Sequence, residues 1–171
     1  LRSVCSVALL ATAGFAVPAQ SALVPSFKSI VLRSASTDSP VEGKSAFAVE
    51  MREMRAVTSS AAASSLVFID ELCRGTESTA GSAIAASILR DLDAKNTRGI
   101  FSTHLHKILD LKDAGKLGLK NTVEMKMEIA DINESDENPY TWKLSSGRST
   151  ESLAFQVAIE EGVDSDIIEF S

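Results

Sequence analysis

Two short apolar runs that end in polar residues constrain the fold most strongly. Leu66–Ile69 and Gly99–Ser102 have the length of strands, and about thirty residues separate their starts. Between them, an apolar residue recurs at every fourth position over Ile84–Leu92, which predicts a helix over Thr79–Asp93. A strand, a helical crossover and a second strand form a parallel unit whose strands are buried on both faces. We therefore predict that the two runs lie in one parallel sheet.

The rest of the chain continues this alternation of helices and strands. Phe47, Met51, Met54 and Val57 fall on one face of a predicted helix over Ala46–Ala62. The other predicted elements are a helix over Val4–Ala13, a strand over Phe27–Arg33, a loop over Ser34–Lys44, an antiparallel strand pair (Val123–Ile129 and Tyr140–Leu144) around the acidic loop Asp131–Asn138, a helix over Ser152–Glu161 closed by Gly162, and a last helix capped by Asp164 or Ser165. This order indicates an α/β fold with a mainly parallel sheet flanked by helices.

The first 22 residues allow two interpretations. An arginine, an apolar run from Val4 to Val17 and small residues over Ala19–Ala22 outline a secretory signal peptide. The alternative is a buried helix that stops at Gly14, because a short apolar run alone does not separate the two. The first residue, Leu1, is not the methionine that a signal peptide would begin with, which weakens that interpretation.

Composition excludes several classes of protein. The chain has 171 residues, of which 44% are hydrophobic, enough for one domain with a buried core. Its net charge of −6 disfavours a surface that coats nucleic acid, which needs an excess of Lys and Arg. Two cysteines, Cys5 and Cys73, are too few for a disulfide framework or a zinc site. No run of 18 apolar residues occurs, so we predict no membrane span.

Two carboxylates follow the first apolar run. Asp70 and Glu71 end a buried strand, where a rigidly held Asp could approach the water shell of Mg²⁺ and a Glu could activate water. The alternative is a core strand that runs into an acidic turn. The polar segment Arg74–Thr76 and Gly81, which precede the next helix, favour the first interpretation because they suit a close approach to phosphate.

A histidine follows the second run. Because neighbouring parallel strands end at the same edge of a sheet, His104 should lie beside Asp70 and could contact a γ-phosphate. The alternative is a helix cap of Ser102 or Thr103 with exposed histidines. His104 and His106 could also bind a metal ion, although no third ligand is evident.

The segment Asp38–Ser45 resembles the end of a phosphate-binding P-loop but departs from it. Asp38 replaces the first glycine, and Pro40 removes one backbone N–H donor from the cradle. Gly43 and Ser45 at a helix N-terminus remain able to bind an anion, while the simpler interpretation makes Ser45 only the helix cap.

The strings SLVFIDELCRGTESTAG and IFSTHLH resemble the C-terminal ATPase domain of the MutS family of DNA mismatch-repair proteins, which are ABC-type P-loop ATPases. The resemblance covers nearly all of residues 1–171. ELCRGTE, STHLH, DSPVEGKS and ESLAF are most similar to the organellar MutS homologues of plants and related lineages; bacterial relatives usually carry Gly where this chain has Cys73.

This resemblance implies a composite ATP site between two subunits. Asp70 and Glu71 match the Walker B pair, with Mg²⁺ held by Asp70 through water, and His104 matches the switch histidine. Gln20 matches the Q-loop glutamine, and Thr76 lies in the segment that matches the D-loop. Gly43 and Ser45 match the signature segment, with Ser45 reaching the γ-phosphate bound by the partner subunit.

The resemblance also carries expectations about the whole protein. It implies ATP hydrolysis coupled to mismatched double-stranded DNA that other domains bind, a homodimer or a MutS-family heterodimer, no membrane, and a location in mitochondria or chloroplasts, with the nucleus as the alternative. The P-loop is expected before Leu1 and the closing helices after Ser171, so we expect this chain alone to bind ATP weakly and not to hydrolyse it.

Two alternatives to this function remain. One is another ABC-type ATPase of DNA maintenance, which usually carries an LSGGQ-like signature where this chain has EGKSAF. The other is a non-catalytic fragment that only mediates contacts between subunits.

Overall fold

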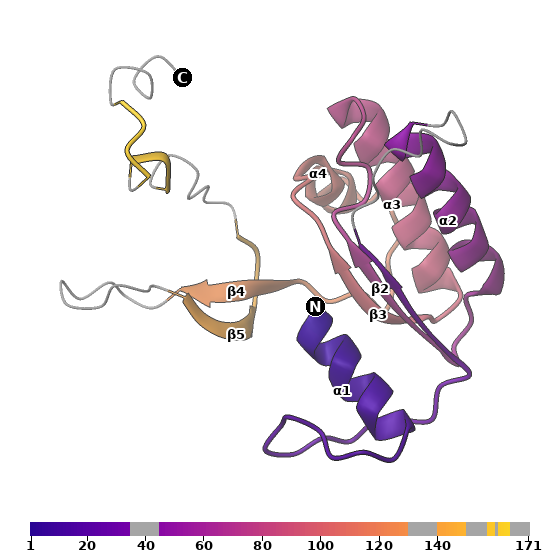
Figure 1. Cartoon of the computed structure of the whole chain (residues 1–171). Coiled ribbons are helices and arrows are strands. Elements are labelled where there is room, and N and C mark those ends of the chain that lie inside the picture. Colours follow the sequence, from indigo (N-terminus) through magenta and orange to yellow (C-terminus); the bar gives the residue numbers. More distant parts are fainter. Residues whose placement is uncertain (35–44, 130–139, 150–156, 160, 165–171) are drawn as a thin grey trace. The chain divides into compact units, whose positions relative to one another are not determined.

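Three parallel strands form the centre of the first part of the structure (Figure 1). They are β1 (Ser29–Arg33), β2 (Ser65–Asp70) and β3 (Arg98–Ser102), with β2 in the middle. The computed structural model describes residues 1–34, 45–129, 140–149, 157–159 and 161–164. The chain divides into two compact units, residues 1–122 and 123–171, and each is described by itself.

Helices cover the sheet of the first unit. α2 (Ala46–Ser60) joins β1 to β2, and α3 (Ser78–Ala94) joins β2 to β3. Because parallel crossovers are right-handed and the strands follow one another in sequence order, both helices lie on the same face of the sheet (Figure 1). α1 (Arg2–Thr12) packs against β1 on the other side, and α4 (Lys107–Asp113) packs against α3.

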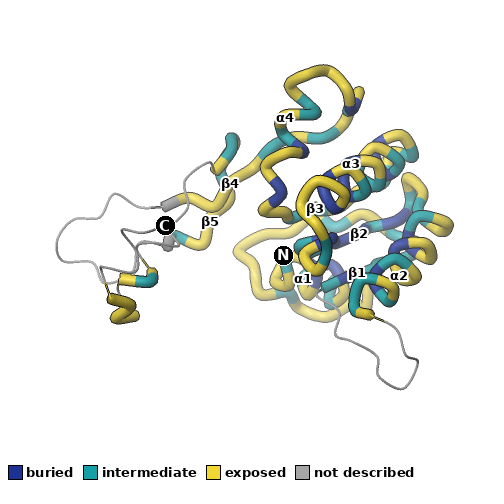
Figure 2. Tube along the Cα trace, turned by 90° about the horizontal axis from the view of Figure 1, so that it is seen from above, coloured by how far each residue is buried: buried dark blue, intermediate teal, exposed yellow. Residues whose placement is uncertain are grey.

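The middle strand β2 is buried on both faces, as its apolar run predicts. Val67 and Ile69 belong to the core beneath α2 and α3, whereas Phe68, fully buried as well, points to the opposite face. Figure 2 shows this burial along β2 and on the facing sides of the helices. The predicted apolar stripe of α2 is confirmed, since Met54 and Val57 are buried while Phe47 and Met51 pack against the same core.

The predicted elements of the first unit are confirmed to within a few residues, with one omission. Gly14 follows the end of α1 with a φ of +79°, the left-handed conformation that glycine tolerates. The predicted loop over Ser34–Lys44 falls almost entirely outside the described residues. α4 is not predicted because its seven residues are too short for a periodic signal. It forms because Leu105 and Ile108 are buried in the core.

A buried aspartate fastens the end of the first unit to α3. Asp93 accepts hydrogen bonds from the backbone N–H of Lys120 at 2.8 Å, from that of Asn121 at 2.9 Å and from the hydroxyl of Thr122 at 2.9 Å. Burial by itself would raise the pKa of Asp93, but these hydrogen bonds outweigh it and lower the pKa below its ordinary value. The ionised carboxylate is therefore the form that the fold stabilises.

We expect Asp93→Asn to lower the free energy of unfolding by about 1–3 kcal/mol at pH 7, because an amide cannot accept all three hydrogen bonds. The pKa of Asp93 is depressed in the folded state, so its stabilisation is complete above the unfolded value of about 4 and is lost as the pH falls below it. Urea unfolding at pH 7 and at about pH 3.5 measures the difference, which should shrink at the lower pH. The control Asp110→Asn, exposed on α4, should change stability by less than about 0.5 kcal/mol at both. A difference that grows on acidification contradicts this account.

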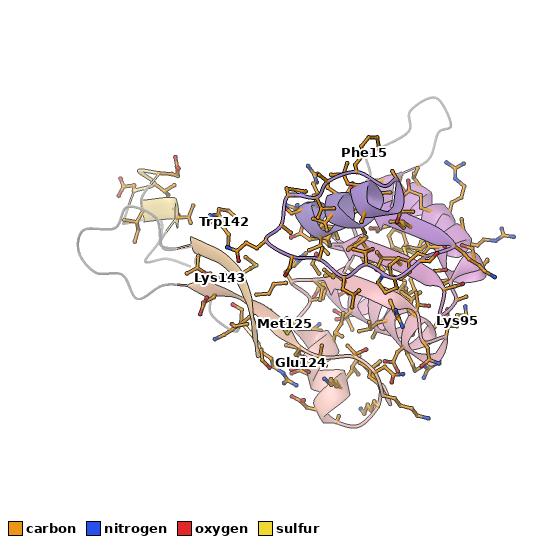
Figure 3. The ribbon with its side chains drawn as sticks, turned by 90° about the horizontal axis from the view of Figure 1, so that it is seen from below. Phe15, Lys95, Glu124, Met125, Trp142 and Lys143 are labelled. Carbon is orange, nitrogen blue, oxygen red and sulfur yellow. The ribbon has the colours of Figure 1, made fainter. Side chains whose placement is uncertain are left out.

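The second unit is built around the predicted antiparallel pair. β4 (Met125–Ile129) and β5 (Tyr140–Ser146) pair antiparallel, with Met127 opposite Leu144. The register shifts between Met127 and Ile129. Trp142 has a φ of +59° and is 74% exposed. Figure 3 shows it on this hairpin, with Glu124, Met125 and Lys143 also labelled.

An ion pair closes the open end of this hairpin. The guanidinium of Arg148 contacts both carboxylate oxygens of Glu124, and the backbone N–H of Gly147 donates to the carbonyl of Glu124 at 3.1 Å. The predicted acidic loop Asp131–Asn138 lies outside the described residues. Of the predicted helix over Ser152–Glu161, residues 157–159 are described and are helical, and Gly162 has the φ of +81° expected of a helix stop. The predicted last helix lies outside the described residues, apart from its candidate cap Asp164.

Candidate functional site

The carboxyl ends of β2 and β3 bring the predicted carboxylates and histidine together. Asp70 pairs with Ser102 in the parallel register, and the Ser102 hydroxyl donates to Asp70 Oδ1 at 2.5 Å. The backbone N–H of Glu71 donates to the carbonyl of Ser102 at 3.0 Å, which extends the pairing one residue beyond β2. Asp70 is therefore held rigidly at the sheet edge, as the strand pattern predicts.

Glu71 leaves the strand in an unusual backbone conformation. Its φ is +46°, in the left-handed region, and this turn directs the chain away from β2. One carboxylate oxygen accepts a hydrogen bond from Arg74 Nη1 at 3.0 Å, and the other lies 3.7 Å from His104 Nδ1. The Glu71 side chain is 39% exposed, so water reaches it. An oriented, accessible carboxylate beside an imidazole can accept a proton from water.

A cavity of about 310 Å³ lies next to this pair. It is lined by cationic or imidazole groups, by hydroxyls and by two buried apolar residues: Arg74, His104, His106 and Lys107; Thr76, Ser78 and Ser82; Cys73 and Leu105. Lys107 Nζ donates to the hydroxyl of Thr79 at 2.6 Å, which holds the ammonium group near the start of α3. Among the residues that the structure describes, no carboxylate lines this cavity, so its walls favour an anion.

A side chain already occupies two backbone N–H groups at the start of α3. Glu77 is the N-cap of α3, and its carboxylate accepts from the backbone N–H groups of Thr79 and Ala80, both at 2.7 Å. The hydrogen bonds from Ala80 and Thr79 hold the pKa of Glu77 below its usual value. A phosphate would have to displace this side chain to reach those two N–H groups.

Gly81 explains how closely this loop packs on α3. A Cβ at Gly81 would lie 3.0 Å from Thr76 Cγ2 and 3.2 Å from both the Cβ and the carbonyl oxygen of Cys73. The glycine therefore allows α3 to pack closely against the loop.

Three predicted site residues, Ser45, Gly43 and Gln20, belong to segments of the chain other than the carboxyl ends of β2 and β3. Ser45 is the N-cap of α2, and its hydroxyl accepts from the backbone N–H of Ala48 at 3.3 Å, which is the simpler of the two interpretations and leaves Ser45 exposed. Gly43 lies outside the described residues. Gln20 is exposed between α1 and β1, and in the described part of the chain no hydrogen bond joins it to Asp70, Glu71 or His104.

Sequence reasoning misses a buried ion pair beneath the site. Arg33, the last residue of β1, lies 2.6 Å from Glu50 of α2, and both side chains are buried. The signal available in the sequence is the position of Glu50, which falls on the apolar face of α2 between Phe47 and Met54. A charged residue on such a face needs a buried partner, and an arginine at a strand end is one.

The buried thiol of Cys73 is poorly suited to act as a nucleophile. The thiol is 1% exposed, and burial raises its pKa to about 11, with a further increase from Glu50 and an opposing effect of Arg33. Its φ of +65° belongs to the left-handed region that favours glycine.

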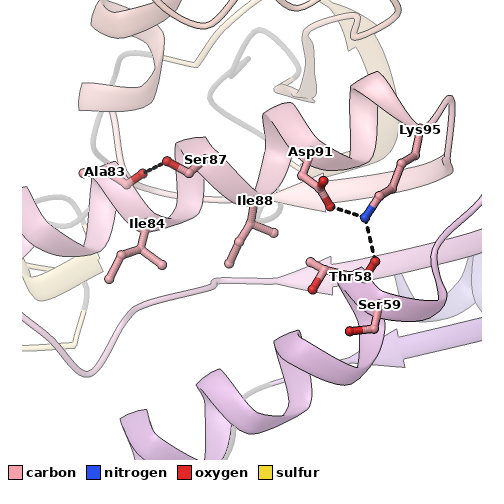
Figure 4. A pocket seen from close by; sticks show the side chains of 8 residues that line it. All are labelled: Thr58, Ser59, Ala83, Ile84, Ser87, Ile88, Asp91 and Lys95. Atoms are coloured by element: carbon pink, nitrogen blue, oxygen red, sulfur yellow. Dashed lines mark hydrogen bonds and ion pairs between the residues drawn. The ribbon is translucent and has the colours of Figure 1, made fainter.

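A second, larger cavity is lined by none of the predicted site residues. It has a volume of about 570 Å³ and lies between α2 and α3 (Figure 4). Its lining includes Ile84, Ile88 and Lys95, whose Nζ bonds Asp91 at 2.6 Å and the carbonyl of Thr58 at 2.7 Å. The chemistry predicted from the sequence thus lies at the smaller cavity.

The described ranges hold neither a metal-ligand cluster nor a membrane-spanning helix. These residues contain no group of three or more His, Cys, Asp or Glu side chains placed to hold a metal ion. None of the helices seen in them is long and apolar enough to cross a membrane.

Comparison with known proteins agrees with the motifs. The family model described as MutS domain V matches residues 1–171. The chain is 48% identical over 169 residues to the DNA mismatch repair protein MSH1, mitochondrial, of Arabidopsis thaliana, an alignment that covers 99% of this chain and 15% of that protein. It is 35% identical over 170 residues to the DNA mismatch repair protein MSH3 of Yarrowia lipolytica (98% of this chain, 16% of that protein). It is also 35% identical over 168 residues to the DNA mismatch repair protein MutS of Desulforamulus reducens (98% and 19%).

The comparisons confirm the motif resemblance. The match includes the first 22 residues, which favours a helix of this domain over a signal peptide, but only Cys5 and Ala8 of α1 are buried, so the expected burial of this helix is limited to one side. The chain spans only 15–19% of the length of these relatives.

Proposed function

Since this chain belongs to the MutS domain V family, we propose that it is the ATP-hydrolysing part of a DNA mismatch-repair protein. The observation that carries this proposal is the cluster of Asp70, Glu71 and His104 at one sheet edge beside a cationic cavity. A carboxylate pair that can hold Mg²⁺ and position water, with an imidazole and positive charge beside it, suits hydrolysis of a phosphoanhydride.

The residues fit a magnesium nucleotide. A single carboxylate at a rigid strand end, such as Asp70, suits Mg²⁺ that keeps waters and shares phosphate oxygens. When bound, Mg²⁺ would neutralise charge on the phosphates. Glu71 would orient and deprotonate the attacking water, while Arg74 fixes the orientation of the Glu71 carboxylate. His104 would contact the transferred group, and Thr76, on the cavity wall beside it, would donate a hydroxyl hydrogen bond.

The proposal extends to two copies of the domain. Ser45 is exposed at the N-terminus of a 15-residue helix, where backbone N–H groups and the helix dipole favour an anion. We assign it, with Gly43, to the nucleotide bound by the partner subunit, and Gln20 to the nucleotide of its own subunit. Hydrolysis would then depend on the geometry of a homodimer or a heterodimer. Similarity to a mitochondrial relative supports a mitochondrial or other organellar location.

The test is ATP hydrolysis by the full-length protein that carries this segment. We expect Mg²⁺-dependent hydrolysis whose rate or ATP affinity differs about fivefold or more between a mismatched and a fully paired DNA duplex. Removal of Mg²⁺ with a chelator should abolish the reaction. Hydrolysis that ignores the mismatch favours another ABC-type ATPase of DNA maintenance, and the absence of both hydrolysis and ATP binding favours a non-catalytic contact module.

A further inference from the structure

A buried ion pair beneath the site contacts more than its own two residues. Arg33 Nη2 lies 2.6 Å from Glu50 Oε1, with the side chains only 4% and 6% exposed. A second carboxylate, Glu53, lies 3.6 Å from Arg33 Nε and is 45% exposed. Burying such a pair costs desolvation energy that its attraction does not always recover, so its presence calls for a reason other than stability.

Both partners also hold the backbone on either side of Glu71. Arg33 Nη1 donates to the carbonyl of Asp70 at 3.1 Å, and Glu50 Oε1 accepts from the backbone N–H of Cys73 at 3.1 Å. Glu71 stands between these two anchored residues in a left-handed conformation. The pair therefore fixes where the strand ends and where the turn that presents Glu71 begins.

The same pair fixes the start of α2. Glu50 lies five residues after the N-cap Ser45, about 7.5 Å along the helix axis. Arg33 is the last residue of β1, so the ion pair joins the two flanks of the segment that leads to Ser45. A helix transmits position along its axis, so a movement at Glu50 moves Ser45.

We propose that Arg33 and Glu50 are positioning residues that link Ser45, which acts on the partner's nucleotide, to Glu71, which acts on the nucleotide of its own subunit. This inference rests on the function proposed above. The state of one composite site is thereby mechanically tied to the other, because a single buried contact sets the placement of both groups.

The most informative single substitution is Arg33→Lys, with kcat and KM of ATP hydrolysis measured in the full-length protein. Lysine keeps the charge beside Glu50 but cannot bridge Glu50 and the Asp70 carbonyl as a planar guanidinium does. We expect KM for ATP to stay within about threefold and kcat to fall about 10–100-fold, since small misplacements of reacting groups are costly. The matched control Glu53→Gln removes the weaker, exposed contact on the same helix and should leave kcat within about twofold.

A double-mutant cycle separates positioning from a merely structural role. Ser45→Ala should lower kcat in the wild-type background but cost far less in the Arg33→Lys background, because Ser45 is already misplaced there. Equal costs in both backgrounds mean that the two act independently, which overturns the proposal. Glu50→Gln, which keeps an oxygen for the Cys73 N–H, serves in the same cycle if Arg33→Lys fails to fold.

Hydrogen–deuterium exchange provides a readout independent of activity. ATP should slow exchange in residues 46–50 and 71–74 together in the wild type, and in Arg33→Lys only in residues 71–74. Protection of both segments in the variant overturns the linkage while leaving the proposed function intact. No protection by ATP in either segment of the wild type instead refutes the proposed function, and the linkage with it.

Discussion

Glu71→Gln should lower the kcat of ATP hydrolysis by about 10²–10⁴-fold in the full-length protein, because an amide cannot accept a proton from water. ATP affinity should change by no more than about threefold, since the substitution keeps the size of the side chain and its contact with Arg74. Single-turnover hydrolysis and equilibrium binding of ATP, measured on the same preparation, separate the two quantities.

The matched control is Glu77→Gln. Glu77 caps α3 and follows Glu71 closely in sequence, yet it does not line the cavity. Its substitution should weaken the cap of α3 slightly and leave kcat within a few-fold. Hydrolysis at the normal rate by Glu71→Gln would remove Glu71 from water activation and direct attention to His104.

Mixing two impaired variants, Ser45→Ala and Glu71→Gln, should restore hydrolysis if Ser45 acts across the subunit interface. In a heterodimer of Ser45→Ala and Glu71→Gln, one composite site carries both changes, whereas the other combines an intact Glu71 with an intact Ser45. Random exchange in a homodimer makes half of the molecules heterodimers with one intact site of two, so about a quarter of the wild-type activity should return. Steady-state hydrolysis before and after subunit exchange measures this.

The controls for this experiment are each variant mixed with itself, and a mixture of Glu71→Gln with Asp70→Asn. Asp70 and Glu71 belong to the same face, so no pairing of these two variants creates an intact site. If Ser45 served the nucleotide of its own subunit, the Ser45→Ala and Glu71→Gln mixture would remain inactive as well.

The sequence predicts the sheet well because its signals are local. The runs Leu66–Ile69 and Gly99–Ser102 and the helical stripe between them specify a parallel unit, and the parallel geometry brings Asp70 and His104 to one edge. The bend at Glu71 could not be predicted, because a left-handed φ at a non-glycine residue is imposed by surrounding contacts rather than by its own propensity.

Long-range contacts account for the rest of what sequence reasoning misses. The pair Arg33–Glu50 joins residues from two elements, and neither residue signals its partner in the sequence. The cap at Glu77 is likewise missed, because its contacts with the backbone N–H groups of Thr79 and Ala80 leave no periodic signal in the sequence. The roles of Gln20 and Gly43 stay predictions drawn from the family resemblance.

The burial of Arg33 and Glu50 has a consequence for the response of the protein to ionic strength. Contacts with DNA phosphates weaken steeply as salt displaces them, whereas mobile ions hardly screen a pair from which water is excluded. In the proposed repair protein, salt would therefore loosen the hold on DNA without loosening the internal connection between Ser45 and Glu71. DNA binding and the internal connection between Ser45 and Glu71 would therefore differ in how strongly they depend on ionic strength.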